Sequence, residues 1–305
     1  MTLSALVVIC TKDRPGEIHR CLAALSAAGC PYEILVVDAS ADEMTHEIIA
    51  KAATEGARVR DTRVAPGLAA QRNLGIEMAR AAGVDVIVFV DDDVIVEQGS
   101  IAQLLEALEH EPTLAAVGPV VVDEPTVRAV TVKSLFRLWS RKPGVVLPSG
   151  RNVLGHLPSG PLCRRVQWLS TCTVAIRLES LGDLRFDERL AGYSYGEDVD
   201  LTFRLSRRGA LAVTARARVR HRPSPLGRPS RSSLARRRTQ LLHAWVVEHE
   251  ADGMHVAWFW WSIFGELLLL SVRGLKAREA WSEARGVIAG AAAILHGKSS
   301  RTVLD

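Results

Sequence analysis

The residues best suited to chemistry in this sequence are three consecutive carboxylates, Asp91-Asp92-Asp93, at the end of an apolar run over residues 84–90. Adjacent negative charges repel one another, so a cation would stabilise them, and hard oxygen ligands favour Mg²⁺ or Mn²⁺. Mg²⁺ is usually shared with substrate phosphates. The triplet alone is also compatible with a solvated acidic turn. Which of these two interpretations holds therefore depends on the helices and strands that position the triplet.

The first 125 residues supply such elements, because apolar strand-like runs alternate with amphipathic helical segments. This alternation predicts an α/β fold with a mostly parallel sheet and helices on both faces. Ligands of such sheets bind beyond the C-terminal ends of the strands, where the run before Asp91 ends. The expected strands cover 3–10, 33–38, 57–63, 84–91 and 114–122, and the expected helices cover 41–55, 68–82, 100–109 and a segment after Pro15-Gly16 that ends near residue 28.

Beyond residue 125 the pattern is less regular. Eight prolines and glycines between residues 143 and 161 predict an irregular loop. Long loops inside a compact domain are usually functional. After this loop we expect a strand over 166–176, a short helix over 197–208 and a strand over 211–221.

The C-terminal third is expected to be helical, over 233–250 and again over the strongly apolar segment 256–272. The second segment is about a turn shorter than the roughly 20 residues of a membrane-spanning helix, and Glu266 interrupts it. Tryptophans at one end and basic residues beyond the other favour a helix that lies at a membrane interface. A buried or dimer-forming helix and a true spanning helix are the alternatives. Residues 286–296 are small and apolar and are expected to pack against it.

Charge and cysteine content narrow the class of protein further. The formal net charge is +4, but residues 201–247 hold twelve arginines and no acidic residue. No aromatic interleaving accompanies these arginines, so we expect no nucleic-acid partner. The arginines could instead face an anionic membrane, a diphosphate-bearing substrate or only solvent, and these three alternatives remain open.

Five cysteines without Cys-x-x-Cys spacing, and no secretory signal at the N-terminus, indicate a reduced, cytoplasmic protein.

Five segments in order resemble the family 2 glycosyltransferases, which have a GT-A (Rossmann-like) fold and use nucleotide-diphosphate sugars. Each motif alone is weak, but the ordered set spans most of residues 3–221. The segments are 7–11 with Lys12-Asp13-Arg14, 33–40 (Glu-Ile-Leu-Val-Val-Asp-Ala-Ser), 66–75 (Pro-Gly-Leu-Ala-Ala-Gln-Arg-Asn-Leu-Gly), 89–93 (Phe-Val-Asp-Asp-Asp), and 185–188 with 196–201 and a closing His221.

The resemblance implies how the donor would be bound. Asp38 would accept a hydrogen bond from the nucleoside base, in a pocket lined by Thr11, Asp13 and Arg14. A strand-ending turn residue is the alternative for Asp38. Arg72 would contact ribose or phosphate through its permanently charged guanidinium, which presents a fork of N–H donors. An exposed helix arginine is the alternative.

The resemblance also assigns the acidic triplet. Asp93 would hold a divalent cation, Mg²⁺ or Mn²⁺, that stabilises the departing diphosphate. Asp91 would face the ribose and contribute to the metal site, and Asp92 would face the sugar or metal-bound water. His221 would be a further metal ligand, which favours Mn²⁺ slightly, or else a histidine that pairs locally on a basic strand.

Catalysis itself is assigned by resemblance to Glu197-Asp198, at a helix start after a glycine- and tyrosine-containing loop. An inverting transfer needs one base to take the acceptor proton, and this would be Asp198, with Glu197 orienting its surroundings. An acidic pair that caps the helix is the alternative. Trp168 is expected on the acceptor side or in the core. Thr171-Cys172-Thr173 departs from the small residues that the family places before the acid loop.

We therefore expect a GT-A catalytic domain over 1–225, with a nucleotide-sugar half over 1–125 and an acceptor half over 126–225, and a helical, membrane-associated extension over 226–305. The expected activity is inverting, metal-dependent transfer of a single sugar from a UDP, GDP or dTDP donor to a lipid-linked or cell-envelope glycan, at the inner face of the cell membrane. The Gln-x-x-Arg-Trp signature of processive synthases is missing. A degenerate glycan-binding scaffold and a sugar nucleotidyltransferase are the alternatives.

Overall fold

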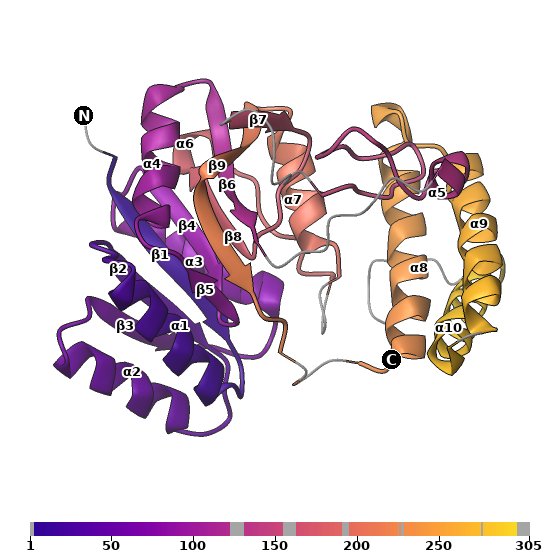
Figure 1. Ribbon diagram of the computed structural model, residues 1–305. Helices are drawn as coiled ribbons and strands as arrows, with labels where there is room; N and C mark the ends of the chain where they lie inside the picture. The colour runs from indigo at the N-terminus through magenta and orange to yellow at the C-terminus, as the bar shows by residue number, and fades with distance from the viewer. Residues whose placement is uncertain are drawn as a thin grey trace. The chain divides into compact units, whose positions relative to one another are not determined.

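The computed structural model describes residues 3–122, 131–154, 163–190, 195–224, 226, 229–275 and 277–297. The chain folds into two compact units. The first unit contains residues 1–126, 155–188 and 197–226, and the second contains 127–154, 189–196 and 227–305. Figure 1 shows the elements of both units in chain order.

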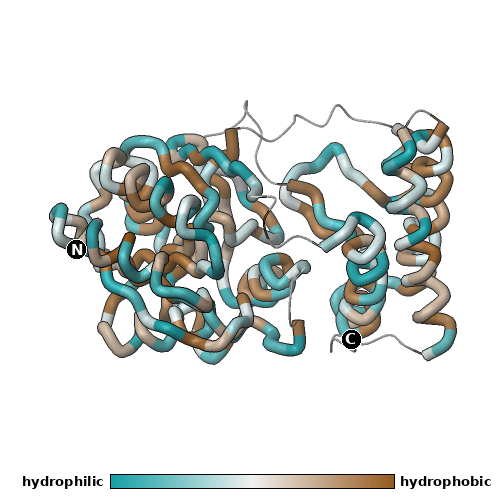
Figure 2. Tube along the Cα trace, turned by 90° about the horizontal axis from the view of Figure 1, so that it is seen from below, coloured by the Kyte–Doolittle hydropathy of each residue, from teal (hydrophilic) through white to brown (hydrophobic). Residues whose placement is uncertain are grey.

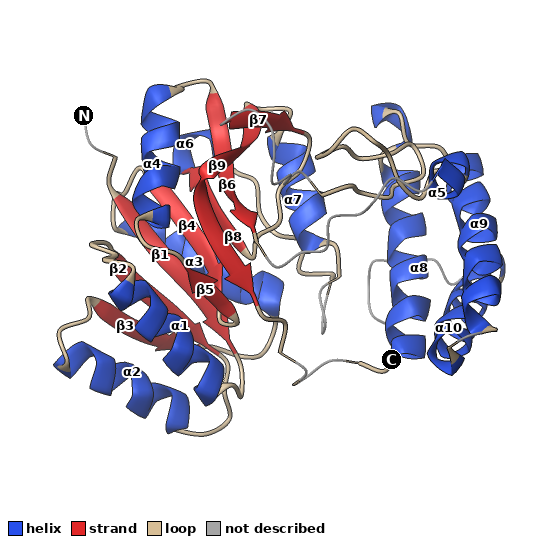
Figure 3. Ribbon diagram, viewed as in Figure 1, coloured by secondary structure: helices blue, strands red, loops and turns tan. Residues whose placement is uncertain are grey.

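The first unit is built on a nine-stranded sheet in which β7 pairs with β9 and the other strands follow the order β3-β2-β1-β4-β8-β6-β9-β5 (Figure 3). The four strands from β3 to β4 are parallel, and beyond β4 the sheet is mixed. The strands are β1 (Ala5–Thr11), β2 (Glu33–Asp38), β3 (Val59–Arg63), β4 (Val86–Asp91), β5 (Val94–Val96), β6 (Leu114–Val121), β7 (Cys163–Val166), β8 (Thr173–Arg177) and β9 (Ala210–His221).

The register of the parallel strands brings their last residues to one edge of the sheet. Thr11 at the end of β1 pairs with Asp38 at the end of β2, and Cys10 pairs with Asp91 at the end of β4. Each of these strands is buried along its length, as expected for strands covered on both faces. The sequence thus places three polar strand ends side by side at the position where α/β sheets bind ligands.

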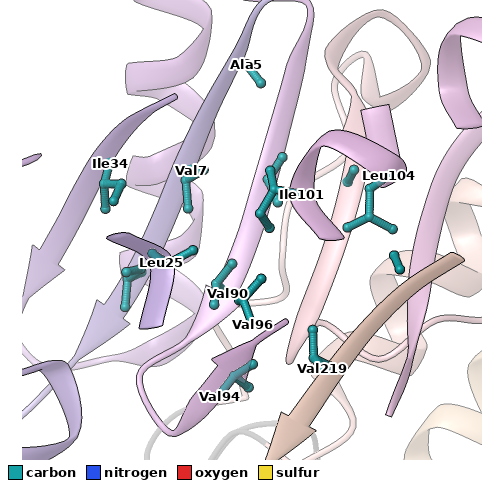
Figure 4. Close-up of a cluster of buried hydrophobic side chains, with 14 of the residues drawn as sticks. Ala5, Val7, Leu25, Ile34, Val90, Val94, Val96, Ile101, Leu104 and Val219 are labelled. Atoms are coloured by element: carbon teal, nitrogen blue, oxygen red, sulfur yellow. The ribbon is translucent and has the colours of Figure 1, made fainter. Parts of the chain in front are cut away.

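Alternate residues of the same strands form two separate cores. Val7 and Val90 belong to the cluster on one face of the sheet (Figure 4), and Val8 and Phe89 belong to the cluster on the other. Helix α3 comes close enough to β1 that a Cβ at Gly75 would lie 2.6 Å from Cγ1 of Val8. The helices of this unit are α1 (Pro15–Ala27), α2 (Met44–Thr54), α3 (Leu68–Ala81), α4 (Ser100–His110), α6 (Leu178–Leu181) and α7 (Glu197–Leu205).

The predicted α/β class is confirmed, but the strand expected over residues 166–176 is wrong. Two strands replace it, β7 ending at Val166 and β8 beginning at Thr173. They pair with different neighbours, β7 with β9 and β8 with β4 and β6, so no single straight strand could make both sets of hydrogen bonds. The irregular loop is observed over the described residues up to Leu154; residues 155–161 lie outside them.

The second unit contains three long helices, α8 (Arg231–Glu248), α9 (Val256–Gly274) and α10 (Arg278–Leu295), with the short helix α5 (Thr131–Leu135) and a 3₁₀ turn, η1 (Glu250–Asp252). Helix α10 packs against α8 through two glycines. A Cβ at Gly286 would lie 2.9 Å from that of Ala235, and one at Gly290 would lie 2.7 Å from the carbonyl oxygen of Arg236. Only glycine allows the two backbones to approach so closely. Figure 2 shows that these helices contain both hydrophobic and hydrophilic residues.

Candidate active site

The three carboxylates of the acidic triplet do not act as one group. Asp92 is 4% exposed and turns into the protein, where it accepts hydrogen bonds from the Thr11 hydroxyl (2.7 Å) and from Arg14 (3.1 Å). Burial raises the pKa of Asp92 to about 6, although Thr11 and Arg14 oppose the shift. The expected contact of Asp92 with the sugar or with metal-bound water stays a prediction. Within the protein, Thr11, Arg14 and Asp92 tie the ends of β1 and β4 together.

The other two carboxylates meet the histidine that ends β9. Ligand atoms of Asp91, Asp93 and His221 all lie within 4.8 Å of one another. Strand β5 pairs with β9 so that Val94 is opposite His221, which brings Nε2 of His221 to 3.1 Å from Oδ1 of Asp93. Two carboxylates and an imidazole are a donor set that suits Mn²⁺ or Mg²⁺, so the residues fit the predicted cation.

Asp93 is kept ionised by its surroundings. Burial alone would raise its pKa, but the hydrogen bonds from His221 and from the Ser224 N–H (2.9 Å) outweigh burial, and the pKa of Asp93 is lowered. Ser224 also donates to Glu17 of α1 at 2.9 Å, which secures the segment after β9. Sequence reasoning missed Glu17 and Ser224, because neither belongs to a motif.

Arg72 connects this cluster to the second acidic pair. Its side chain is 3% exposed, and it donates to Asp91 at 2.9 Å and to Glu197 at 2.7 Å. Its guanidinium also lies over the ring of Phe186, 5.3 Å from the centroid. Burial opposes the charge, but Asp91 and Glu197 more than compensate, and the pKa of Arg72 is raised. Arg72 was expected to contact ribose or phosphate; in the structure both ends of its fork are engaged by carboxylates.

The second acidic pair opens helix α7 directly after Gly196, whose φ of +85° favours glycine. Burial raises the pKa of Glu197 to about 7 despite the nearby Arg72, and the charge of Asp198 adds to the shift. Burial also raises the pKa of Asp198, against the hydrogen bond that Oδ1 accepts from the Val199 N–H at 2.8 Å. Carboxylates with raised pKa values are suited to proton transfer near neutral pH.

The end of β2 offers a buried carboxylate oxygen. Asp38 is fully buried, and its Oδ1 accepts a hydrogen bond from the Ser40 N–H at 2.8 Å. Its Oδ2 has no hydrogen-bond partner in the structure, which is costly for a buried polar atom. Asp13 lies next to it with a φ of +52° and accepts from the Ala41 N–H at 2.9 Å. A nucleoside base that donates an N–H would satisfy Oδ2 of Asp38.

Trp168, expected on the acceptor side or in the core, is 3% exposed. It precedes Leu169, whose N–H donates to the Thr202 hydroxyl of α7 at 3.0 Å.

The arginine-rich stretch over residues 201–247 does not give an uninterrupted basic surface, because several of its arginines form ion pairs with acidic residues from other parts of the sequence. These pairs are Arg208 with Asp183, Arg216 with Glu106, and both Arg218 and Arg220 with Glu97.

The sheet, with polar strand ends at one edge and a carboxylate–histidine cluster beside a second acidic pair, defines a GT-A type of nucleotide-sugar enzyme. The chain belongs to glycosyl transferase family 2, whose sequence it matches over residues 6–160. It is thus a glycosyltransferase, as the ordered motifs predicted.

Known relatives and solved structures agree with this family and fold. An N-acetylglucosaminyl-diphospho-decaprenol L-rhamnosyltransferase of Mycobacterium tuberculosis is 29% identical over 262 residues, which cover 75% of this chain and 80% of the relative. A structure of GalNAc-T7 with UDP, GalNAc and Mn²⁺ has a TM-score of 0.55 at 16% identity; the match covers 77% of this chain but only 47% of GalNAc-T7. Residues 1–349 of S. aureus TarS have a TM-score of 0.53 at 14% identity, with 97% of this chain and 92% of that chain covered. At these identities the two structures show the fold alone.

Proposed function

We propose that this protein is an inverting, metal-dependent glycosyltransferase that adds a single sugar to a hydroxyl of a lipid-linked acceptor at the cytoplasmic face of a membrane. One observation supports it above all others. Arg72 joins the Asp91 end of the cation-binding cluster to Glu197 of the second acidic pair. A cluster suited to a diphosphate is thereby held beside a pair suited to proton transfer.

The donor would bind across the ends of β1, β2 and β4. Oδ2 of Asp38 would accept from the base, and Asp91, Asp93 and His221 would hold the cation. That cation, Mg²⁺ or Mn²⁺, would neutralise charge that develops on the departing diphosphate. The donor would carry UDP, GDP or dTDP, whose bases each present an N–H to Oδ2 of Asp38.

Asp198 would act as the base. Its carboxylate takes the proton of the acceptor hydroxyl while that oxygen bonds to the anomeric carbon and the bond from this carbon to the diphosphate breaks. Inversion follows because attack and departure occur on opposite faces. Glu197, fixed by Arg72, would position the backbone of Asp198 at the first turn of α7. The relative from M. tuberculosis supports a polyprenyl-diphosphate-linked sugar as acceptor and a nucleotide-activated rhamnose as one donor to test.

The test is transfer from a panel of nucleotide sugars with and without Mn²⁺ or Mg²⁺. We expect Asp198→Asn to lower kcat by about 10²- to 10⁴-fold while nucleotide binding is retained, as for loss of a general base. Asp93→Ala should abolish the metal dependence and weaken nucleotide binding. Asp183→Asn is the matched control, because Asp183 is an exposed carboxylate that pairs with Arg208. Binding or turnover of no donor, with either metal, would refute the proposal.

A further inference from the structure

One face of the second unit exposes eight large apolar side chains. They come from α5, from α9 and from Leu275, the residue after α9, and each is between 37% and 82% exposed. We refer to them as the α5–α9 face. The face consists of Val132, Leu135, Trp258, Trp261, Phe264, Leu268, Val272 and Leu275.

These residues form one surface because α5 is fixed to α9. The indole N–H of Trp261 donates to the carbonyl oxygen of Leu135 at 2.9 Å. The ring of Phe136 lies 5.2 Å from that of Trp261 and 5.9 Å from that of Phe264. Gly265 leaves the space that Phe136 occupies, since any Cβ there would overlap its ring. Along α9 the exposed residues recur every three or four positions, which keeps them on one side of the helix.

The opposite side of α9 faces the interior of the second unit. Phe259, Ile263 and Leu270 are buried, and Glu266 forms ion pairs with both Arg151 and Arg238. By length and composition α9 could cross a membrane, and 33% of its most apolar window is buried. Crossing the bilayer, however, would separate Glu266 from its two arginines in a medium without water, at a large cost. The helix is therefore built to expose one side only.

The charges near the α5–α9 face indicate which kind of partner it binds. Residues 131–142 contain four basic residues and no acidic one. Lys133, Arg137, Arg141 and Lys142 are all exposed, and the guanidinium of Arg137 lies 4.8 Å from the ring centroid of Trp258. A second copy of the chain would bring these like charges together. Anionic lipid headgroups would neutralise them, while tryptophan side chains are suited to the boundary between headgroups and acyl chains.

We propose that the α5–α9 face lies in the surface of an anionic membrane, with α9 parallel to the bilayer and its apolar side chains among the acyl chains. This deepens the membrane placement in the proposed function by naming the surface and the lipid charge. It does not depend on the chemistry of Asp198. Membrane binding and sugar transfer can therefore fail independently.

The experiment measures co-sedimentation of the full chain with phosphatidylcholine vesicles that contain or lack phosphatidylglycerol. The unchanged protein should bind the anionic vesicles and bind the neutral ones much more weakly. The combination Phe264→Ser, Leu268→Ser and Val272→Ser removes side chains that are 45% to 59% exposed and should weaken anionic binding at least about 100-fold. Replacing Lys133, Arg141 and Lys142 by Gln should weaken it about fivefold per charge, or roughly 100-fold in total.

Met44→Ser with Val247→Ser is the matched control, because both residues are comparably exposed but lie outside the α5–α9 face. That variant should bind as the unchanged protein does. All variants should retain donor hydrolysis, which separates loss of the membrane surface from loss of the active site. Unaltered binding of the triple Ser variant would overturn the proposal. So would a dimer in light scattering that this variant converts to monomer, or resistance of the cellular protein to alkaline carbonate extraction, which would indicate a spanning helix.

Discussion

Replacing Arg72 by Met should destabilise the fold strongly and in a pH-dependent manner. Both ends of its guanidinium contact carboxylates, with side chains that are 3% exposed for Arg72, 30% for Asp91 and 11% for Glu197. Removing one partner from a buried ion pair costs about 3–5 kcal/mol. Asp91 can recover some hydration, so we expect the lower part of this range, about 3 kcal/mol, at pH 8.

The cost should be smaller at pH 6. Burial already raises the pKa of Glu197 to about 7, so below pH 7 this side chain is mostly protonated and needs no cation. Without Arg72 the pKa of Glu197 rises further, and the folded variant binds a proton at pH values where the unfolded chain does not. Stability is then lost as pH rises, so the difference between variant and unchanged protein grows from pH 6 to pH 8.

The assay is urea unfolding at both pH values, with nucleotide binding measured in parallel. Arg60→Met is the control, because Arg60 pairs with Glu33 on the surface, where both side chains are more than 40% exposed, and should cost less than about 1 kcal/mol. Adding Glu197→Gln to Arg72→Met should recover part of the loss at pH 8. If Arg72→Met costs no more than Arg60→Met while nucleotide binding is lost, Arg72 is a ligand contact and the bridging role is refuted.

Two further outcomes test other parts of the structure. In the unchanged protein the raised pKa of Glu197 should make the unfolding free energy fall by roughly 3 kcal/mol as pH rises from about 4.5 to about 7. Glu197→Gln should make this slope shallower in urea unfolding, while the part due to Asp92 and Asp198, whose pKa values are also raised, remains. A slope identical to that of the unchanged protein would contradict the raised pKa of Glu197. Gly286→Ala should lower the free energy of unfolding by about 1–3 kcal/mol, because its Cβ would overlap the backbone of Ser232. Gly16→Ala is the control, because a Cβ at Gly16 has room and the change should be nearly neutral. Equal thermal stability of the two variants would exclude the close approach of α8 and α10.

The ends of β1, β2 and β4 could be predicted from the sequence because their signal is local. Each strand is a short apolar run that ends at a polar residue, and parallel strands bring such ends to one edge. The separate environments of the three carboxylates could not be read in this way, because Asp91 ends β4 while Asp92 and Asp93 lie in the turn before β5, where strand alternation does not apply.

Other features depend on contacts that no local pattern encodes. Arg72 is 19 residues from Asp91 and 125 from Glu197 in the sequence, so its bridging position depends on the completed fold. The break between β7 and β8 is of the same kind, since it arises from pairing with different neighbours. The arginines of β9 looked unpaired in sequence because Glu97 and Glu106 lie more than 100 residues earlier.

The second unit draws its chain from three separate stretches, and this has a consequence for inheritance. Pro148 and Arg151, from the first stretch, contact His255 and Glu266 in the last, and the middle stretch ends at Gly196, covalently joined to Glu197. Such a unit cannot be gained, lost or exchanged by a single genetic fusion at one end of the gene. Changes in the helices must be accommodated by residues that lead directly into the acidic pair. Residues 3–122, in contrast, form one uninterrupted stretch, although their strands β4, β5 and β6 pair with β8 and β9 from later in the chain.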